Sequence, residues 1–195
     1  MRQPRVRAIE RTNLMDWRTL FDARPIVVAL AGPNGAGKST FFSAHLAETG
    51  LRFVNADDLA AEMGVGAYEA AELAASLRAG LVEQRESFVF ETVLSDPVGA
   101  KVAELVETAR KGIHVGLVFI RLDSPETAKQ RVAMRVMQGG HDVPDAKIEP
   151  RFQRALVNLE RAITALPVVV VFDNTDLARP FRLEAVYEAD TRIGP

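Results

Sequence analysis

A glycine-containing segment at residues 32–40 constrains the fold of this chain more than any other feature. An apolar run at 26–31 precedes it and predicts a buried strand, and the apolar spacing at 41–47 predicts a helix after it. A strand, a glycine loop and a helix in this order predict a phosphate-binding P-loop. The segment fits the pattern G-x-x-x-x-G-K-[ST] and consists of Gly32, Pro33, Asn34, Gly35, Ala36, Gly37, Lys38, Ser39 and Thr40.

The residue types of this loop suit the binding of a nucleoside triphosphate. Glycine lets the backbone approach the phosphates closely because no Cβ intrudes, and the amides at the helix start then face an anion. We expect Lys38 to reach the β- and γ-phosphates and the Ser39 hydroxyl to hold Mg²⁺. ATP and Mg²⁺ are therefore the expected cofactors.

The composition limits the protein to a few classes. A chain of 195 residues, 48% hydrophobic and 26% charged, is typical of one globular domain, here residues 1–195 with 1–24 as an N-terminal extension. The net charge of −2 argues against a broad nucleic-acid surface, and no apolar run approaches the ~18 residues of a membrane span. The absence of cysteine excludes disulfides and thiol catalysis and fits the cytoplasm, where we expect the protein to act.

Strand and helix patterns alternate along the whole chain. This alternation predicts an α/β fold of the P-loop NTPase type, a parallel sheet of about five core strands with helices on both faces. An alternating segment at 181–187 predicts an additional edge strand. The five core strands are expected at 26–31, 51–55, 87–91, 113–122 and 168–172.

Four of these five strands end close to an acidic residue. Ligands of parallel sheets gather at the carboxyl ends of the strands, and phosphoryl transfer requires one carboxylate near Mg²⁺ and one near the acceptor hydroxyl. Asp57 and Glu91 are the candidates, because their strands are expected to neighbour the P-loop strand; helix capping is the alternative for each. Asp123 is interpreted as part of a helix cap beside Ser124, and Asp173 as part of a turn.

Two arginine pairs flank a glycine-rich loop at 139–144. Arg131 and Arg135 are one turn apart on one predicted helix, and Arg151 and Arg154 are one turn apart on the next. Two such helices predict a lid at about 131–154 that closes over the triphosphate and excludes water. Solvated surface helices are the alternative for each arginine alone, and the P-loop favours a function for Arg135 and Arg151.

Taken together, the motifs resemble those of the zeta-toxin family over about residues 26–175. The resemblance implies a kinase that transfers the γ-phosphate of ATP to a hydroxyl of a small molecule, and the best-known members phosphorylate the 3′-hydroxyl of the amino sugar in UDP-N-acetylglucosamine. It also implies an antitoxin-like inhibitor protein as a partner. The motifs are Asn55-Ala56-Asp57, Glu91-Thr92-Val93-Leu94-Ser95, Arg131-x-x-x-Arg135, Gly139-Gly140-His141, Arg151 and Asp173-Asn174.

The resemblance implies a role for each residue of the phosphate site. Lys38 and Ser39 match the positions that bind the nucleotide and Mg²⁺. Asp57 matches the aspartate that takes the proton of the acceptor. Arg135 and Arg151 match the arginines on the transferring phosphate.

The acceptor side departs from the family pattern. Glu91, with Thr92 or Val93 behind it, matches the acceptor-binding position. Toxin members carry E-G-T-x-R at this strand, whereas Ser95 stands here at the place of the arginine. This departure leaves open an acceptor other than UDP-N-acetylglucosamine.

Two other classes of protein remain as alternatives. The first is an ABC-type ATPase, because residues 137–141 (M-Q-G-G-H) resemble the L-S-G-G-Q signature; the strand at 168–172, however, is not followed by the Asp-Glu pair of that class. The second is a non-catalytic ATP-binding regulatory module. A pure sensor has no use for a second carboxylate and lid arginines, so a kinase is favoured.

Overall fold

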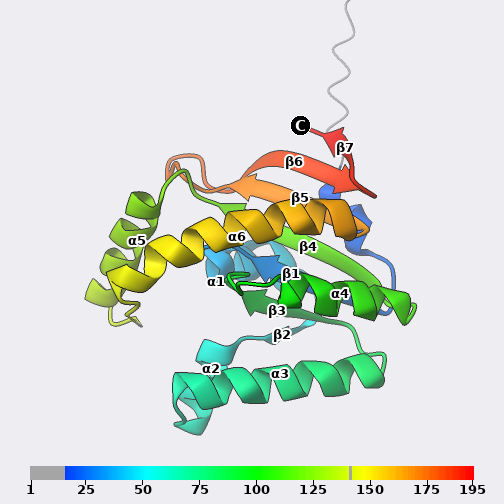
Figure 1. Cartoon of the computed structure of the whole chain (residues 1–195), viewed down its shortest axis with the longest axis horizontal. Helices are drawn as coiled ribbons and strands as arrows, with labels where there is room; N and C mark the ends of the chain where they lie inside the picture. The colour runs from blue at the N-terminus through cyan, green and yellow to red at the C-terminus, as the bar shows by residue number, and fades with distance from the viewer. Residues whose placement is uncertain (1–15, 141) are drawn as a thin grey trace, which may run out of the picture.

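The computed structural model describes residues 16–140 and 142–195, and within these ranges seven strands form one sheet in the order β2-β3-β1-β4-β5-β6-β7 (Figure 1). The first five strands in the chain run parallel, and the last two pair antiparallel. The basic residues at the start of the chain and His141 lie outside the described residues. The strands are β1 (Ile26–Ala31), β2 (Arg52–Val54), β3 (Phe88–Thr92), β4 (His114–Arg121), β5 (Val168–Asp173), β6 (Arg182–Glu188) and β7 (Thr191–Gly194).

The structure confirms the predicted α/β fold and its parallel core and corrects two details of the sheet. The segment predicted as an edge strand is β6, which is not at the edge, because β7 pairs with its outer side. The expectation that the strand before Asp57 neighbours the P-loop strand is wrong, since β3 lies between β2 and β1. The three residues of β2 include the exposed Arg52, which suits an edge, whereas Phe88, Val89 and Phe90 of β3 are buried.

The helix predicted after the P-loop begins as α1 at Lys38 and continues beyond Phe41 as a π-helix to Leu46. Gly64 ends α2 with a φ of 66°. Ser124 caps α5 by accepting the Thr127 N–H, with Pro125 as the first helical residue. The helices are α1 (Lys38–Phe41), α2 (Ala56–Met63), α3 (Ala67–Glu83), α4 (Ala100–Arg110), α5 (Pro125–Met137) and α6 (Asp145–Ala165).

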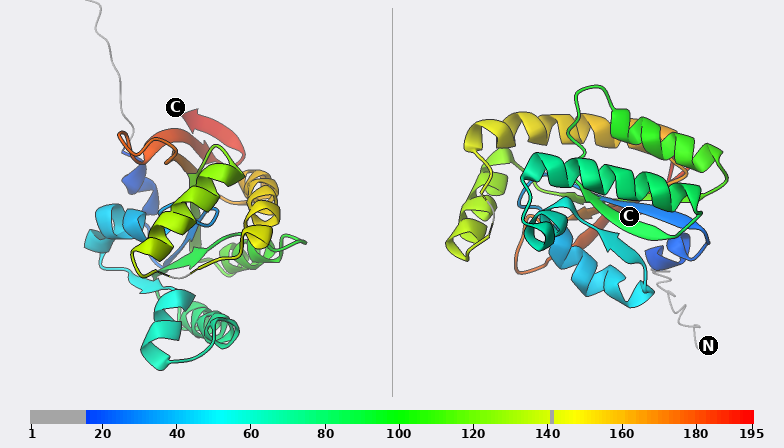
Figure 2. Two further views of the ribbon diagram at one scale, coloured as in Figure 1. Left: turned by 90° about the vertical axis from the view of Figure 1, so that its left-hand side faces the viewer. Right: turned by 90° about the horizontal axis from the view of Figure 1, so that it is seen from below.

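Helices cover both faces of the sheet. Helices α4 and α6 cross one face, and α1 lies on the other with the 3₁₀-helix η1 (Trp17–Phe21) (Figures 1 and 2). Side chains of β1 alternate between two hydrophobic clusters, with Val27 and Ala29 in one and Val28 and Leu30 in the other. Burial on both faces explains why this strand is apolar throughout.

The carboxyl ends of the parallel strands form the edge of the sheet that carries the candidate site. The P-loop joins β1 to α1 at this edge, and α5 and the start of α6 lie beyond it (Figure 1). No helix in the described part of the chain is long and apolar enough to cross a membrane. The predicted P-loop, strand-end carboxylates and lid helices therefore all lie at one end of the sheet.

Candidate active site

The P-loop between β1 and α1 adopts a conformation that requires glycine. Gly32 has a φ of 144°, and a Cβ on it would lie 2.3 Å from the carbonyl oxygen of Ile120. Gly37 has a φ of 86°, and its Cβ would lie 2.9 Å from Nδ2 of Asn174. Any larger residue at these two positions would displace the loop from the strands and turn that support it.

Lys38 is buried at the base of this loop. Its Nζ donates to the carbonyl oxygens of Gly32 at 3.1 Å and Pro33 at 3.2 Å, and lies 3.5 Å from Oε1 of Glu91. Burial lowers the pKa of Lys38, and the attraction of Glu91 opposes that shift. The ammonium group is therefore held where phosphate oxygens approach a P-loop.

Glu91 connects the P-loop to the neighbouring strands. Its Oε2 accepts hydrogen bonds from Ser39 Oγ at 2.8 Å and from Asn55 Nδ2 at 3.3 Å. The contact follows from the pairing of β1 with β3, in which Leu30 stands opposite Glu91. A serine hydroxyl and a carboxylate thus lie side by side next to the phosphate-binding loop.

This pair of oxygen groups fits Mg²⁺. The ion prefers one or two protein oxygen ligands and completes its octahedron with water and substrate phosphates. Among the described residues, no three His, Cys, Asp or Glu side chains are grouped to hold a metal alone. Ser39 and Glu91 would therefore share the ion with the phosphate oxygens of ATP.

Asp57 lies in the first turn of α2, but it is not the cap of that helix. Asn55 is the N-cap, and its Oδ1 accepts the backbone N–H of Asp57 at 2.9 Å. The capping interpretation of Asp57 is therefore wrong. The exposed Asp57 carboxylate instead lines a cavity together with Lys38 and Glu91.

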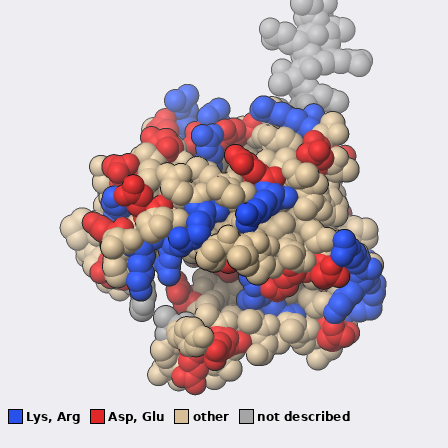
Figure 3. Space-filling model, viewed as in Figure 1, with Lys and Arg blue, Asp and Glu red and all other residues tan. Residues whose placement is uncertain are grey.

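That cavity has a volume of about 290 Å³ and brings together residues that are far apart in the sequence. The P-loop, α2, β3, α5 and α6 all contribute to its wall. Figure 3 shows a hollow on this side of the molecule with basic side chains along its upper border. The lining residues are Asn34, Gly35, Lys38, Asp57, Glu91, Val93, Arg135, Asp142, Val143, Pro144, Lys147 and Arg151.

One arginine of each predicted pair lines the cavity. These are Arg135 on α5 and Arg151 on α6, the two that the sequence favoured. Arg131 instead donates to the carbonyl oxygen of Thr175 at 2.8 Å, and Arg154 donates to that of Ser95 at 2.7 Å. The other arginine of each pair, Arg131 or Arg154, thus binds the backbone of a neighbouring loop.

The residues that line the acceptor side of the cavity differ from those predicted to bind the acceptor. Thr92 is not among its lining residues, because its Oγ1 accepts the Leu94 N–H at 3.0 Å, and Val93 lines the wall instead. Lys147 also lines it and was missed. The available signal was its position four residues before Arg151, which puts both on one helix face.

Asn174 belongs to a motif of the family resemblance, but the sequence did not predict its contact. The predicted turn is present, since Asp173 Oδ1 accepts the Thr175 N–H at 2.9 Å. Asn174, however, points to the P-loop: its Nδ2 donates to the carbonyl oxygen of Ala36 at 2.8 Å. It therefore supports the phosphate-binding loop from the end of β5, a contact without a local sequence signal.

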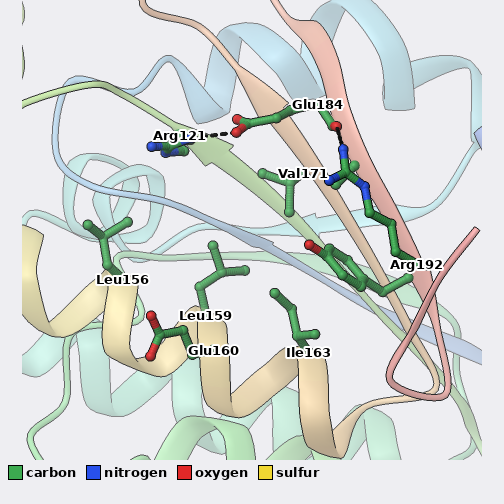
Figure 4. Close-up of a pocket in the computed structure, with 10 residues that line it drawn as sticks. Arg121, Leu156, Leu159, Glu160, Ile163, Val171, Glu184 and Arg192 are labelled. Carbon is green, nitrogen blue, oxygen red and sulfur yellow. Dashed lines mark hydrogen bonds and ion pairs between the residues drawn. The ribbon is translucent and has the colours of Figure 1, made fainter. Parts of the chain in front are cut away.

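A second cavity of about 270 Å³ lies between α6 and the strands β5 and β6 (Figure 4). Leu159, Ile163 and Val171 supply apolar walls. Its charged residues include Arg121 and Glu184, which form an ion pair with each other. None of the residues predicted to bind ATP or the acceptor lines this cavity.

Comparisons with known proteins agree with this fold. The chain is similar in structure to AvrRxo1-ORF1:-ORF2 with ATP, at 20% identity and a TM-score of 0.68, covering 90% of this chain and 63% of that one. It is also similar to the PezAT toxin-antitoxin system of Streptococcus pneumoniae, at 20% identity and a TM-score of 0.57, covering 80% of this chain and 72% of that one.

These likenesses show a shared fold, and this chain spans only 63% of the length of the AvrRxo1 chain. A search of curated protein sequences finds no match. The family model of the zeta toxins, by contrast, matches residues 14–184, which is most of the chain. This chain belongs to the zeta-toxin family.

Proposed function

We propose that this chain is an ATP-dependent kinase that transfers the γ-phosphate to a hydroxyl of a small molecule. The observation that carries the proposal is the cavity shared by Lys38, Asp57, Glu91, Arg135 and Arg151. Two carboxylates and three cations around a P-loop provide what phosphoryl transfer needs: neutralisation of the triphosphate, a metal site and a base. Membership of the zeta-toxin family supports the same class of reaction.

In this proposal the P-loop amides and Lys38 bind the triphosphate. Arg135 and Arg151 approach from the lid helices and stabilise the charge that develops on the equatorial oxygens of the transferring phosphate. The segment at about 131–154 acts as the lid of a single domain and excludes water from the transfer. Mg²⁺, held by Ser39 and Glu91, would neutralise the phosphate oxygens.

Asp57 is the proposed base. The Glu91 carboxylate bonds to Ser39 and Asn55 and lies close to Lys38, which leaves it on the metal side of the cavity. Asp57 enters the same cavity from α2. A carboxylate in that place accepts the proton of the acceptor hydroxyl and orients its oxygen for attack.

The proposal extends to the acceptor molecule and to a protein partner. UDP-N-acetylglucosamine is the first acceptor to test, because the family resemblance points to it, and Ser95 in place of an arginine is the reason to test others. The PezAT system pairs a toxin with an antitoxin. An inhibitor protein of the antitoxin type is the corresponding proposal here, with action in the cytoplasm.

The experiment is an incubation with ATP-Mg²⁺ and a panel of nucleotide sugars and hydroxyl metabolites, followed by mass spectrometry. The proposal predicts one product heavier by one phosphate and ADP in equal amount. ATP turnover that does not depend on any acceptor would favour the ABC-type ATPase. Tight ATP binding without turnover would favour the regulatory module.

A further inference from the structure

The segment that leaves β3 is held by side chains of α6. Asn158, which is 1% exposed, donates its Nδ2 to the carbonyl oxygens of Leu94 and Asp96, both at 2.9 Å. Arg154 donates its Nε to the carbonyl oxygen of Ser95 at 2.7 Å. Three consecutive carbonyl groups are therefore bound by one helix.

The held segment has a conformation that needs such support. Leu94 is buried and has a φ of 57°, a left-handed conformation that residues other than glycine rarely adopt. Thr92 Oγ1 accepts the Leu94 N–H and tightens the turn. Strained backbone of this kind persists only where the surroundings fix it, and here α6 supplies the fixing contacts.

The same helix reaches the active-site cavity. Lys147, Arg151, Arg154 and Asn158 follow one another at intervals of four, three and four residues, which places them along one face of α6. The first two line the cavity and the last two hold the segment after β3. Glu91 and Val93 of the held strand end line that cavity as well.

We propose that Asn158, assisted by Arg154, is a positioning residue that couples the acceptor side of the cavity to its phosphate side. Through these bonds, Val93 on the acceptor side keeps a fixed place relative to Arg151, and a movement of α6 toward the triphosphate carries the segment 92–96 with it. This inference rests on the proposed function, because the movement is a response to bound nucleotide.

Hydrogen–deuterium exchange of the intact chain, with and without ATP-Mg²⁺, tests this coupling in the variant Asn158→Leu. Leucine keeps the number of side-chain heavy atoms and the branching at Cγ, and it removes the amide. Thr108→Val is the matched control: Thr108 is buried on α4, and its hydroxyl donates within that helix to the carbonyl oxygen of Glu104 at 2.9 Å. Both variants lose one buried polar side chain, and only the first loses the contact with 92–96.

In the wild type and in Thr108→Val, ATP-Mg²⁺ is expected to slow exchange in both 147–151 and 92–96. In Asn158→Leu, ATP-Mg²⁺ is expected to slow exchange in 147–151 but not in 92–96. Without ATP-Mg²⁺, the segment 92–96 of this variant is expected to exchange about tenfold faster than that of the control. If Asn158→Leu does not fold, Arg154→Met replaces it, because the Arg154 side chain is only half-buried. This variant is expected to reduce the slowing of exchange in 92–96 by ATP-Mg²⁺.

Equal slowing of 92–96 by ATP-Mg²⁺ in Asn158→Leu and in the wild type overturns the inference. Exchange in 92–96 that does not respond to ATP-Mg²⁺ in the wild type overturns it too, while slowed exchange in 32–40 leaves the proposed function standing. If exchange in 32–40 is also unchanged, the proposed function fails together with the inference.

Discussion

Two cavities of nearly equal volume border α6, about 290 Å³ at the P-loop and about 270 Å³ beside β6, but their walls differ in kind. Acidic and basic side chains from five separate segments meet in the first. In the second, Leu159 and Ile163 line the wall, and Arg121 and Glu184 neutralise each other. Volume alone therefore does not distinguish the two cavities, whereas the P-loop and its buried Lys38 line only the first of them.

The difference has a physical basis. Removing a lysine from water is unfavourable, and the lowered pKa of Lys38 reflects that penalty. A fold tolerates such a group where compensating charges and carbonyl oxygens are supplied, as Glu91 and Gly32 supply them here. Perturbed charged groups in a cleft are for this reason indicators of a functional site.

Among the cations of the first cavity, the largest expected effect is that of Lys38→Ala. We expect phosphate transfer to fall about 10³-fold, because the charge on the γ-phosphate loses its main partner in the loop. Measurement of product formation and of thermal unfolding checks this, with the exposed Lys111→Ala as the control. Wild-type turnover in Lys38→Ala would refute the nucleotide assignment.

A smaller effect is expected for Arg135→Ala and Arg151→Ala. Each is expected to lower kcat by about 10–10² and to leave ATP affinity without acceptor nearly unchanged, because contacts to developing charge strengthen in the transition state. Steady-state kinetics and calorimetric ATP titration measure the two quantities, with the exposed Arg110→Ala as the control. Equal losses in kcat and in ATP affinity would show that these arginines bind the ground state and the transition state equally.

The smallest effect on transfer is expected for Ile163→Ala in the second cavity. The truncation removes packing from a half-buried site and is expected to lower the free energy of unfolding by about 1–2 kcal/mol. Transfer at 25 °C should remain at the wild-type level. Denaturant unfolding and product formation test both parts, and a large loss of transfer without loss of stability would assign a functional role to this cavity.

The fold was predictable where its signals are local. A few neighbouring residues are enough to recognise the apolar run at 26–31, the glycine loop and the cap at Ser124. The structure contains all three. The order of the strands carries no such signal: periodicity shows that Phe88 and Val54 are buried, but not which strand stands next to β1. The separation of β2 from β1 by β3 therefore needed the structure.

The same distinction applies to the candidate site. Lys38, Asp57, Glu91, Arg135 and Arg151 could be proposed from motif, strand end and helix spacing. The bonds that support them, such as Asn174 to the carbonyl of Ala36 or Asn158 to that of Leu94, join segments distant in the sequence. A single sequence gives no signal for a hydrogen bond between two such distant segments.

The central claim is that this cavity transfers phosphate to an acceptor and does not only bind ATP, and Asp57→Asn tests it most directly. Asparagine keeps the shape and removes the base, so product formation should fall about 10²–10⁴-fold while ATP-Mg²⁺ affinity stays near that of the wild type. Asp58→Asn is the matched control, since Asp58 lies in the same turn of α2 and does not line the cavity. The account predicts that Asp58→Asn retains most of its activity; product formation by Asp57→Asn equal to that of the wild type would contradict it.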